Sequence, residues 1–299
     1  MKKRWIFLGI LVFIVGFVLM FPYVALRDYV IGRSLENTGA YVFFGPMWPT
    51  WDGFGLQIQD TTVQFILDQN AKGELEAEIP KIRFLIPWKS LVSFSPYLAT
   101  EVDLEAQSFI RAKVFYGSGK VQLESQWTDF AFAPYLRKLG WVPMDISGIV
   151  TLQLKGSMKP MGDHQLTALE SQWMIKKLFV GAVEVGGFSF PDFEFGSDAE
   201  ITLKSTDGKN INVGMMLGKT DADPIILNSE GVIVLDPQSQ EKSTFNLKHR
   251  ITISQALKSQ PSVASMLPIL EPFLSTEGNY HVHTIGNLIP SLTQFPTTF

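Results

Sequence analysis

An uncharged apolar run at the start of the chain constrains everything that follows it. The run extends from Trp5 to Val24 and reads WIFLGILVFIVGFVLMFPYV. A helix of this length is about 30 Å long, which matches the hydrocarbon core of a bilayer. Three basic residues precede it: Lys2, Lys3 and Arg4. Such a basic flank stays in the cytoplasm, so we expect the rest of the chain to lie across the membrane.

A cleaved signal peptide would share the basic start and the apolar run. Its cleavage site needs small residues in an A-x-A-like pattern, whereas LMFPYVALRDYV has bulky groups at nearly every position. A buried helix of a soluble protein would rarely contain so long an uncharged stretch. We therefore predict a cytoplasmic tail and transmembrane anchor at residues 1–26, followed by an exported β-rich domain at residues 27–299. That domain is expected to begin with a short helical stalk ending at Gly39.

The composition of the exported domain excludes several classes of function. The chain has 25 lysines and arginines, three of them in the predicted tail, against 29 aspartates and glutamates. The domain is therefore acidic and lacks the basic balance that nucleic-acid binding requires. With 0 cysteines, disulfides, thiolate nucleophiles and cysteine-ligated metals are excluded. The excess of Phe (23) over Tyr (7) suits either a phenylalanine-rich core or an exposed apolar groove.

Apolar and polar residues alternate through most of the chain after the anchor. Phe54, Leu56 and Ile58 begin one such segment, and a change of parity at Asp60 predicts a β-bulge there. Similar segments recur, separated by turn signals such as GSG at 117–119 and TDGKN at 206–210. These connections are too short for parallel crossovers, so we predict a long twisted antiparallel sheet.

Short helical patches interrupt the strands in three places. The patches are PWKSLVSF, APYLRKLG and SQALKSQPSVASMLPILEPFLS. Pro87 and Pro134 suit a first helical position, Ser254 suits an N-cap, and Gly140 suits the end of the second patch. The mainly β fold should therefore contain a few short helices that plug or cap the ends of the sheet.

No catalytic constellation emerges from the sequence. His281 and His283 share one face of a predicted strand, but a catalytic zinc normally needs three protein ligands, so we interpret them as solvated strand residues. His164 lies in the turn-like PMGDHQ, and no G-x-S-x-G elbow is present. The chain also lacks the glycine-rich motifs that bind nucleotides. We predict no enzyme activity and no cofactor.

An acidic stretch, TDADPIILNSEG, could suggest a calcium loop. It contains Asp221, Asp223 and Glu230, but the twelfth position of an EF-hand pattern, which requires glutamate, falls on Val232. The D-P step instead favours a turn. We therefore predict a turn and no metal site.

Several strands are apolar on both parities, among them the segment near Ile175–Val180, and one of them provides the candidate site residues. These are Val232, Ile233, Val234 and Leu235. A strand buried on both faces explains the pattern most simply. The functional interpretation is a twisted sheet with an apolar concave face that shields acyl chains or a hydrophobic partner segment. Periodicity alone does not distinguish the two.

Two stretches give the chain a family resemblance: FPYVALRDYV after the anchor, and the half beginning near Phe188. Together with GFGLQIQDTTVQF, FSFPDFEFG, ITLKSTDGKNINVGMMLG, SEGVIVLDP and EGNYHVHTIGNLIPSL, they resemble the N component of type II secretion systems, GspN, over nearly the whole chain. The alternation of strands and short helices is also similar to AsmA-type proteins. That second resemblance implies a periplasmic sheet with an apolar trough used in lipid homeostasis or transport. Neither resemblance implies catalytic residues.

These observations predict a single-pass protein of the cell inner membrane with a periplasmic C-terminal domain. Its expected function is a non-enzymatic accessory or scaffold of type II protein secretion, with other secretion-system proteins as partners. The alternative is an AsmA-like lipid-binding or lipid-transfer module, for which phospholipid would be the partner. A third possibility, an envelope hydrolase, would need a site that the sequence does not reveal.

Overall fold

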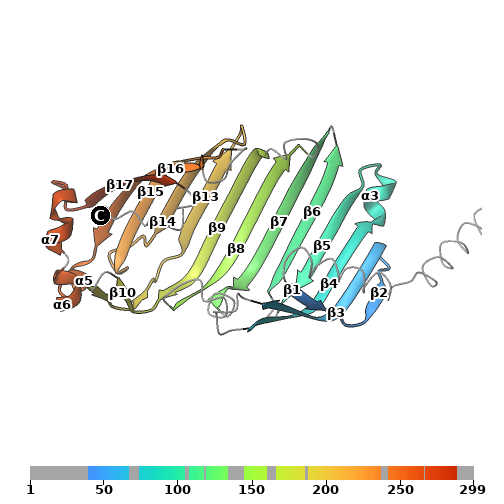
Figure 1. Cartoon of the computed structure of the whole chain (residues 1–299), viewed down its shortest axis with the longest axis horizontal. Helices are drawn as coiled ribbons and strands as arrows, with labels where there is room; N and C mark the ends of the chain where they lie inside the picture. Colours follow the sequence, from blue (N-terminus) through green and yellow to red (C-terminus); the bar gives the residue numbers. More distant parts are fainter. Residues whose placement is uncertain are drawn as a thin grey trace, which may run out of the picture.

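The chain forms one long antiparallel sheet with a few short helices, which confirms the mainly β prediction (Figure 1). The computed structural model describes residues 40–66, 74–104, 108–117, 119–133, 145–159, 166–185, 188–236, 242–265 and 267–287. The predicted anchor, the stalk and Gly39 lie outside these residues. Within them, no helix has the length and apolar character needed to cross a membrane.

The main sheet contains 15 strands. In chain order they are β1 (Ala40–Phe43), β2 (Met47–Pro49), β3 (Gly53–Ile66), β4 (Glu74–Pro87), β5 (Tyr97–Asp103), β6 (Phe109–Gly117), β7 (Lys120–Ala131), β8 (Ile146–Met158), β9 (Leu166–Val180), β12 (Phe193–Glu194), β13 (Ala199–Ser205), β14 (Asn210–Leu217), β15 (Ile225–Val234), β16 (Thr244–Ile253) and β17 (Tyr280–Asn287). A separate hairpin pairs β10 (Val183–Val185) with β11 (Phe188–Phe190).

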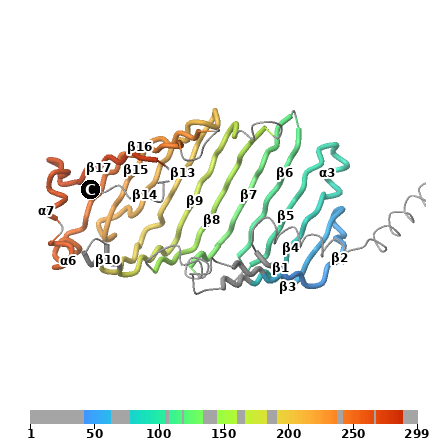
Figure 2. Tube along the Cα trace, viewed as in Figure 1, coloured from blue at the N-terminus to red at the C-terminus, as the bar shows by residue number. Residues whose placement is uncertain are grey.

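The strands lie side by side almost in chain order (Figure 2). The order of the main path is β1-β3-β4-β5-β6-β7-β8-β9-β13-β14-β15-β16-β17, while β2 also pairs with β3 and β12 also pairs with β9. Because each strand pairs with its neighbour in sequence, the sheet grows by simple hairpins. The turns predicted at GSG and TDGKN connect β6 to β7 and β13 to β14. In the second turn, Asp207 Oδ1 accepts hydrogen bonds from the backbone N–H groups of Lys209 and Asn210 at 2.9 and 2.8 Å.

The bulge predicted at Asp60 is not present between β3 and β4. Their register is unchanged on both sides of this residue, with Gln59 opposite Lys81 and Thr61 opposite Ile79. Asp60 instead adopts a φ of 49°, in the left-handed region that aspartate tolerates better than most residues. The change of parity in the sequence therefore reflects a local backbone twist rather than an inserted residue.

Short helices occupy two of the three predicted places. Helix α3 (Trp88–Val92) follows Pro87, which takes the N-cap position rather than the first helical one. Near the end of the chain lie α5 (Gln255–Lys258), α6 (Pro261–Ala264), α7 (Leu267–Leu270) and the 3₁₀ helix η3 (Glu271–Phe273). Ser254 is the N-cap of α5, as predicted, and its Oγ accepts from the N–H of Leu257 at 3.3 Å. The patch with Pro134 and Gly140 lies outside the described residues.

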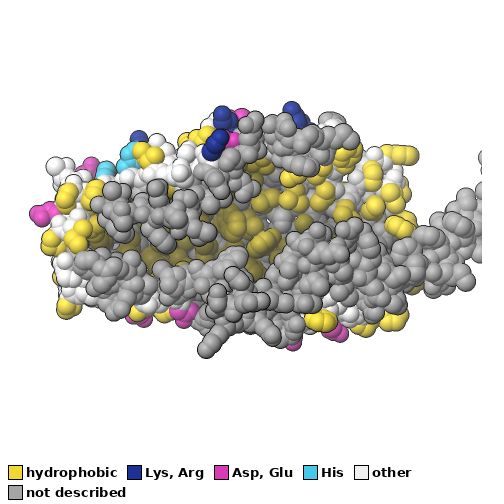
Figure 3. All heavy atoms as spheres, viewed as in Figure 1, with side chains coloured by type: hydrophobic (Ala, Val, Ile, Leu, Met, Phe, Trp, Pro, Cys, Tyr) yellow, Lys and Arg dark blue, Asp and Glu magenta, His cyan; other side chains and the backbone are white. Residues whose placement is uncertain are grey.

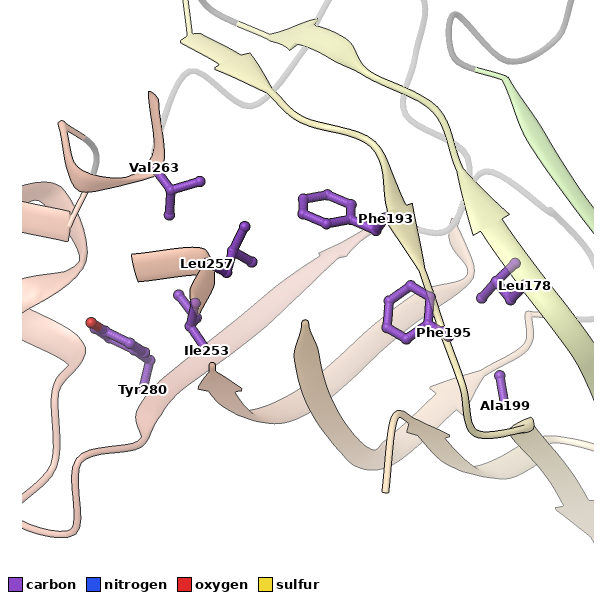
Figure 4. Close-up of a cluster of buried hydrophobic side chains, with 8 residues drawn as sticks. All are labelled: Leu178, Phe193, Phe195, Ala199, Ile253, Leu257, Val263 and Tyr280. Atoms are coloured by element: carbon purple, nitrogen blue, oxygen red, sulfur yellow. The ribbon is translucent and has the colours of Figure 1, made fainter. Parts of the chain in front are cut away.

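The largest buried apolar cluster closes the β17 end of the sheet (Figure 4). Its members come from β9, the β12 segment, β13, β16, α5, α6 and β17: Leu178, Phe193, Phe195, Ala199, Ile253, Leu257, Val263 and Tyr280. Helices of four residues are not stable alone, so burial of Leu257 and Val263 in this cluster holds α5 and α6 in place. The helices thus cap one end of the sheet, in agreement with the prediction.

Asp223 connects two turns beside this cluster. Asp223 is 1% exposed. Its carboxylate accepts hydrogen bonds from the backbone N–H groups of Gly196, Ser197, Lys219 and Thr220. It also accepts from the hydroxyls of Ser197 and Thr220. Burial opposes ionisation, but the hydrogen bonds led by the Ser197 hydroxyl outweigh it and hold the pKa of Asp223 below its usual range. Residues 220–224 of the acidic stretch therefore form a turn, as predicted, which Asp223 supports, and the rest of the stretch belongs to β15.

We predict that Asp223→Asn lowers the free energy of unfolding by about 3 kcal/mol, because an amide cannot accept all these hydrogen bonds. A depressed native pKa stabilises the fold above the unfolded pKa of about 3.9, so the difference from wild type should shrink as the pH falls below about 4. Urea unfolding at several pH values measures both effects. Asp221→Asn, at an exposed position of the same turn, is the control; equal losses in both variants would contradict the role of Asp223.

Candidate functional site

One face of the sheet is apolar from β3 to β14. Antiparallel register brings one residue of every strand on the path from β3 to β14 into a continuous cross-strand row. The row consists of Ile58, Ile82, Val102, Ile110, Trp127, Leu152, Trp173, Ile201 and Met215. Neighbouring strands lie about 4.8 Å apart, so the row is about 38 Å long. An acyl chain spans about 15 Å, half of a bilayer core, so two chains fit along it end to end.

A parallel row on the same face extends the apolar surface sideways. It contains Leu56, Phe84, Thr100, Ala112, Ser125, Leu154, Ser171, Leu203, Val213, Gly231 and Leu247. Its members are apolar, small or hydroxyl-bearing, and none is charged. The apolar face is therefore at least two rows wide over most of its length.

The opposite face of the sheet is polar. Arg83 donates hydrogen bonds to both Asp52 and Glu101, and Arg111 lies 3.8 Å from Glu101. The row continues with glutamines at 126, 153 and 172. Strands with one apolar and one polar face are typical of antiparallel sheets that cover a core.

Most of the apolar face is only half-buried. Leu152 is 2% and Ile58 4% exposed, whereas the side chains of Ile110, Leu154 and Ile201 are half-buried. Figure 3 shows apolar side chains gathered in a hollow along the middle of the molecule. The extended buried cluster that the described residues form lies at the β17 end, beyond this middle stretch. The apolar face is therefore accessible to solvent over much of its length. We call this accessible surface, which contains Ile110, Leu154 and Ile201, the floor.

Two tryptophans lie in the centre of this floor. Trp127 and Trp173 are neighbours on β7 and β9, on either side of β8, with ring centroids 6.3 Å apart. The indole N–H of Trp127 donates to Ser125 Oγ at 3.0 Å. The indole N–H of Trp173 and the hydroxyl of Ser171 are buried without a hydrogen-bond partner. The sequence analysis did not single out these residues. Each tryptophan directly follows a glutamine, Gln126 or Gln172, and this polar–apolar alternation could have indicated an apolar face.

A polar patch interrupts the apolar face near its β17 end. His249 shares hydrogen bonds of 2.8 Å with Ser229 through Nδ1 and with Thr284 through Nε2. Burial, followed by the nearby charge of His283, lowers the pKa of His249, so the ring is neutral at pH 7. Both ring nitrogens are engaged by hydroxyls, which makes this a structural polar network.

The four residues singled out from the sequence do not form one surface. Val232 and Val234 line a depression of about 770 Å³ on the polar face, together with Thr202, Lys204 and Asn246. Ile233 lies on the apolar face, opposite Ile211 and Phe245. Leu235 follows β15, where its N–H donates to the carbonyl of Lys209 at 2.8 Å. Ile233 thus lies on the apolar face beside the second row, and because side chains alternate along a strand, Val232 and Val234 face the other way.

The histidine pair considered from the sequence lies on the polar face. His281 and His283 are exposed residues of β17, as predicted, and His283 Nε2 is 2.7 Å from Asn246 Oδ1. Among the described residues, no three histidine, aspartate or glutamate side chains gather in a way that could hold a metal ion. His164 lies outside the described residues.

Comparison of the chain with family models, curated proteins and solved structures found no match. The resemblances to GspN and AsmA-type proteins therefore stay predictions.

We predict that Leu152→Ala lowers the free energy of unfolding by about 3 kcal/mol, because Leu152 is one of the few fully buried members of the central row. Gln153→Ala changes the next residue, which is exposed on the polar face, and should cost less than about 0.5 kcal/mol. Chemical denaturation of both variants checks the assignment of faces. Similar losses at the two positions would contradict it.

Proposed function

We propose that this protein binds the acyl chains of phospholipids along the apolar face of its sheet. The observation that supports this proposal is the continuous row from Ile58 to Met215, which is half-buried over much of its length. A soluble surface rarely leaves so long an apolar strip accessible unless the strip has an occupant. Transfer of an acyl chain onto such a floor removes about 25 cal/mol of unfavourable hydration per Å² of apolar surface buried.

The shape of the floor favours acyl chains over a compact ligand. It is long and narrow, it contains no charged side chain in either row, and its hydroxyls are few. A polar ligand would find few hydrogen-bond partners there beyond the Ser171 hydroxyl and the Trp173 indole N–H. A hydrocarbon chain has no such groups and can follow the twist of the sheet. Catalysis forms no part of this proposal.

Lipid binding by the full chain can be tested with a photo-crosslinking amino acid. Placed at Leu123, on the apolar face between Val114 and Gly156, it should give phospholipid adducts in membranes. Placed at Glu124, the next residue and exposed on the polar face, it should give few or none. Mass spectrometry of the adducts reads out both. Equal lipid labelling at both positions, or none at either, would contradict the proposal.

A scaffold role in type II secretion is the second proposal, carried by the edge of the sheet. Among the described strands, β17 forms a ladder with β16 alone, and its one other contact of this kind is the bridge between Leu274 and Tyr280. A free strand edge can pair with an extended segment of a partner protein. With the anchor predicted from the sequence, this edge would lie in the periplasm, at the end of the sheet opposite the strands that follow the anchor.

The edge proposal predicts protein adducts from β17. Ile285 is 68% exposed on this strand, so a photo-crosslinker there should capture a discrete protein in intact cells. The same probe at Lys155, exposed on the polar face in mid-sheet, is the control. A band shared by both positions would reflect chance encounters and count against the edge.

A further inference from the structure

Two loops at the β3 end of the sheet form an exposed apolar tip. One is the β2–β3 turn, with Trp51, and the other is α3 with the residues that follow it. The side chains that define the tip are Trp51, Trp88, Leu91, Val92 and Phe94. Trp51 is 90%, Val92 80% and Phe94 93% exposed, which is unusual for side chains of this size. Apolar side chains are also visible at this end of the molecule in Figure 3.

Backbone contacts hold the two loops together, so the tip is preformed. The indole N–H of Trp88 donates to the carbonyl of Trp51 at 2.9 Å, and the backbone N–H of Trp88 donates to the carbonyl of Asp52 at 3.3 Å. Within the second loop, the N–H groups of Phe94 and Ser95 donate to the carbonyls of Leu91 and Ser90 at 3.2 and 3.1 Å. The apolar side chains are therefore presented by an ordered hairpin-like unit.

Phe94 is held in an unfavourable backbone conformation. Its φ of 55° lies in the left-handed region, which glycine adopts easily and a bulky residue does not. Because Phe94 is almost fully exposed, packing against the protein interior does not explain why a phenylalanine occupies this position. Strained backbone at an exposed position commonly marks a surface that contacts something else.

The charges of the tip are few. Asp52 is paired with Arg83, whose hydrogen bond lowers the pKa of the Asp52 carboxyl. Lys89 is the single basic residue of residues 50–53 and 88–96. A surface dominated by tryptophan, phenylalanine and aliphatic groups suits the interface of a bilayer, where indole rings are favoured. Such a surface does not suit a partner that binds through charged groups.

The position of the tip in the chain favours a membrane as the surface that the tip contacts. Residues 27–39 separate the predicted anchor from Ala40, the first residue of β1, and at about 3.5 Å each this tether spans at most about 45 Å. Strand β2 pairs with β3 near its start beside Trp51, whereas β1 pairs with the far end of β3, where Ala40 lies opposite Phe65. Phe65 lies about 40 Å along the strand from Gly53, a distance that the tether can span. The anchor is therefore tethered to the edge of the sheet that bears the tip, and the tether is long enough for the tip to reach the same bilayer.

We propose that this tip inserts into the interfacial layer of the bilayer that contains the anchor. Insertion of such side chains reaches about 5–10 Å, into the boundary between head groups and acyl chains. Phe54, Phe84 and Leu98, which lie on the apolar face at this same end, are themselves exposed. The docked tip thus places the beginning of the apolar face beside lipid. The docking depends on the tip and on the anchor predicted from the sequence, and it would hold even if the apolar face bound no lipid.

The chain has no cysteine, so single labels can be placed cleanly on the full-length protein. Val92→Cys labelled with an environment-sensitive fluorophore, in phosphatidylcholine nanodiscs, should show blue-shifted emission and quenching by lipids with a doxyl group near the head-group end of the acyl chain. Quenching should persist at high salt, because the insertion is apolar. Ser259→Cys, exposed on the residue that follows α5 at the opposite end, should show neither effect.

Two outcomes would overturn the proposal. A label at position 92 that is quenched by aqueous iodide and not by doxyl lipid would show that the tip faces water. A label shielded from both quenchers would show that protein, from a second copy or another part of the chain, covers the tip.

Phe94→Gly in the Val92→Cys background provides a second measurement. It relieves the backbone strain, so the fold is retained, and removal of the ring should weaken doxyl quenching; unchanged quenching would contradict a part for Phe94 in insertion.

Discussion

The register between neighbouring antiparallel strands is the constraint on which the rest of the structure depends. Among the described strands of the path from β3 to β17, it shifts only locally, within the β7–β8 and β8–β9 pairs. A slip of one residue between any two strands would move the side chains of one strand to the other face. The register instead keeps Ile110 opposite Trp127, Trp127 opposite Leu152, and Leu152 opposite Trp173. Alternation that is local in each strand thereby becomes one apolar surface and one polar surface for the whole sheet.

A sheet with one apolar face needs a covering for that face. At the β17 end the covering is internal, because α5 and α6 bury Leu257 and Val263 against β12 and β17 residues. Over the middle of the sheet the apolar side chains are half-buried, and at the β3 end Phe54 and Phe84 are exposed. The end that bears the apolar tip therefore exposes Phe54 and Phe84, although Ile58 beside them is buried, whereas the capped end buries its cluster. In the proposed function, lipid supplies the missing cover, and the tip places the exposed end at the source of that lipid.

Local chemistry could be predicted well from the sequence, while the surfaces could not. The N-cap at Ser254, the hairpin at TDGKN and the turn at Asp223 are set by neighbouring residues, so local patterns were enough. Val232 was grouped with Ile233 because both are apolar, yet pairing with β14 and β16 places them on opposite faces. The floor around Trp173 depends on strands far apart in sequence, whose order periodicity does not reveal. The tip was missed because hydrophobicity alone does not distinguish an exposed Phe94 from a buried one.

Native mass spectrometry of the full-length chain released from lipid nanodiscs tests the central claim most directly. The account predicts that the wild-type protein retains bound phospholipid. It also predicts that Leu123→Gln combined with Leu154→Gln, both half-buried on the apolar face, loses that lipid while the fold persists. Glu124→Gln combined with Lys155→Gln, the adjacent residues on the polar face, should retain as much lipid as wild type. Equal lipid retention by all three proteins would contradict the account.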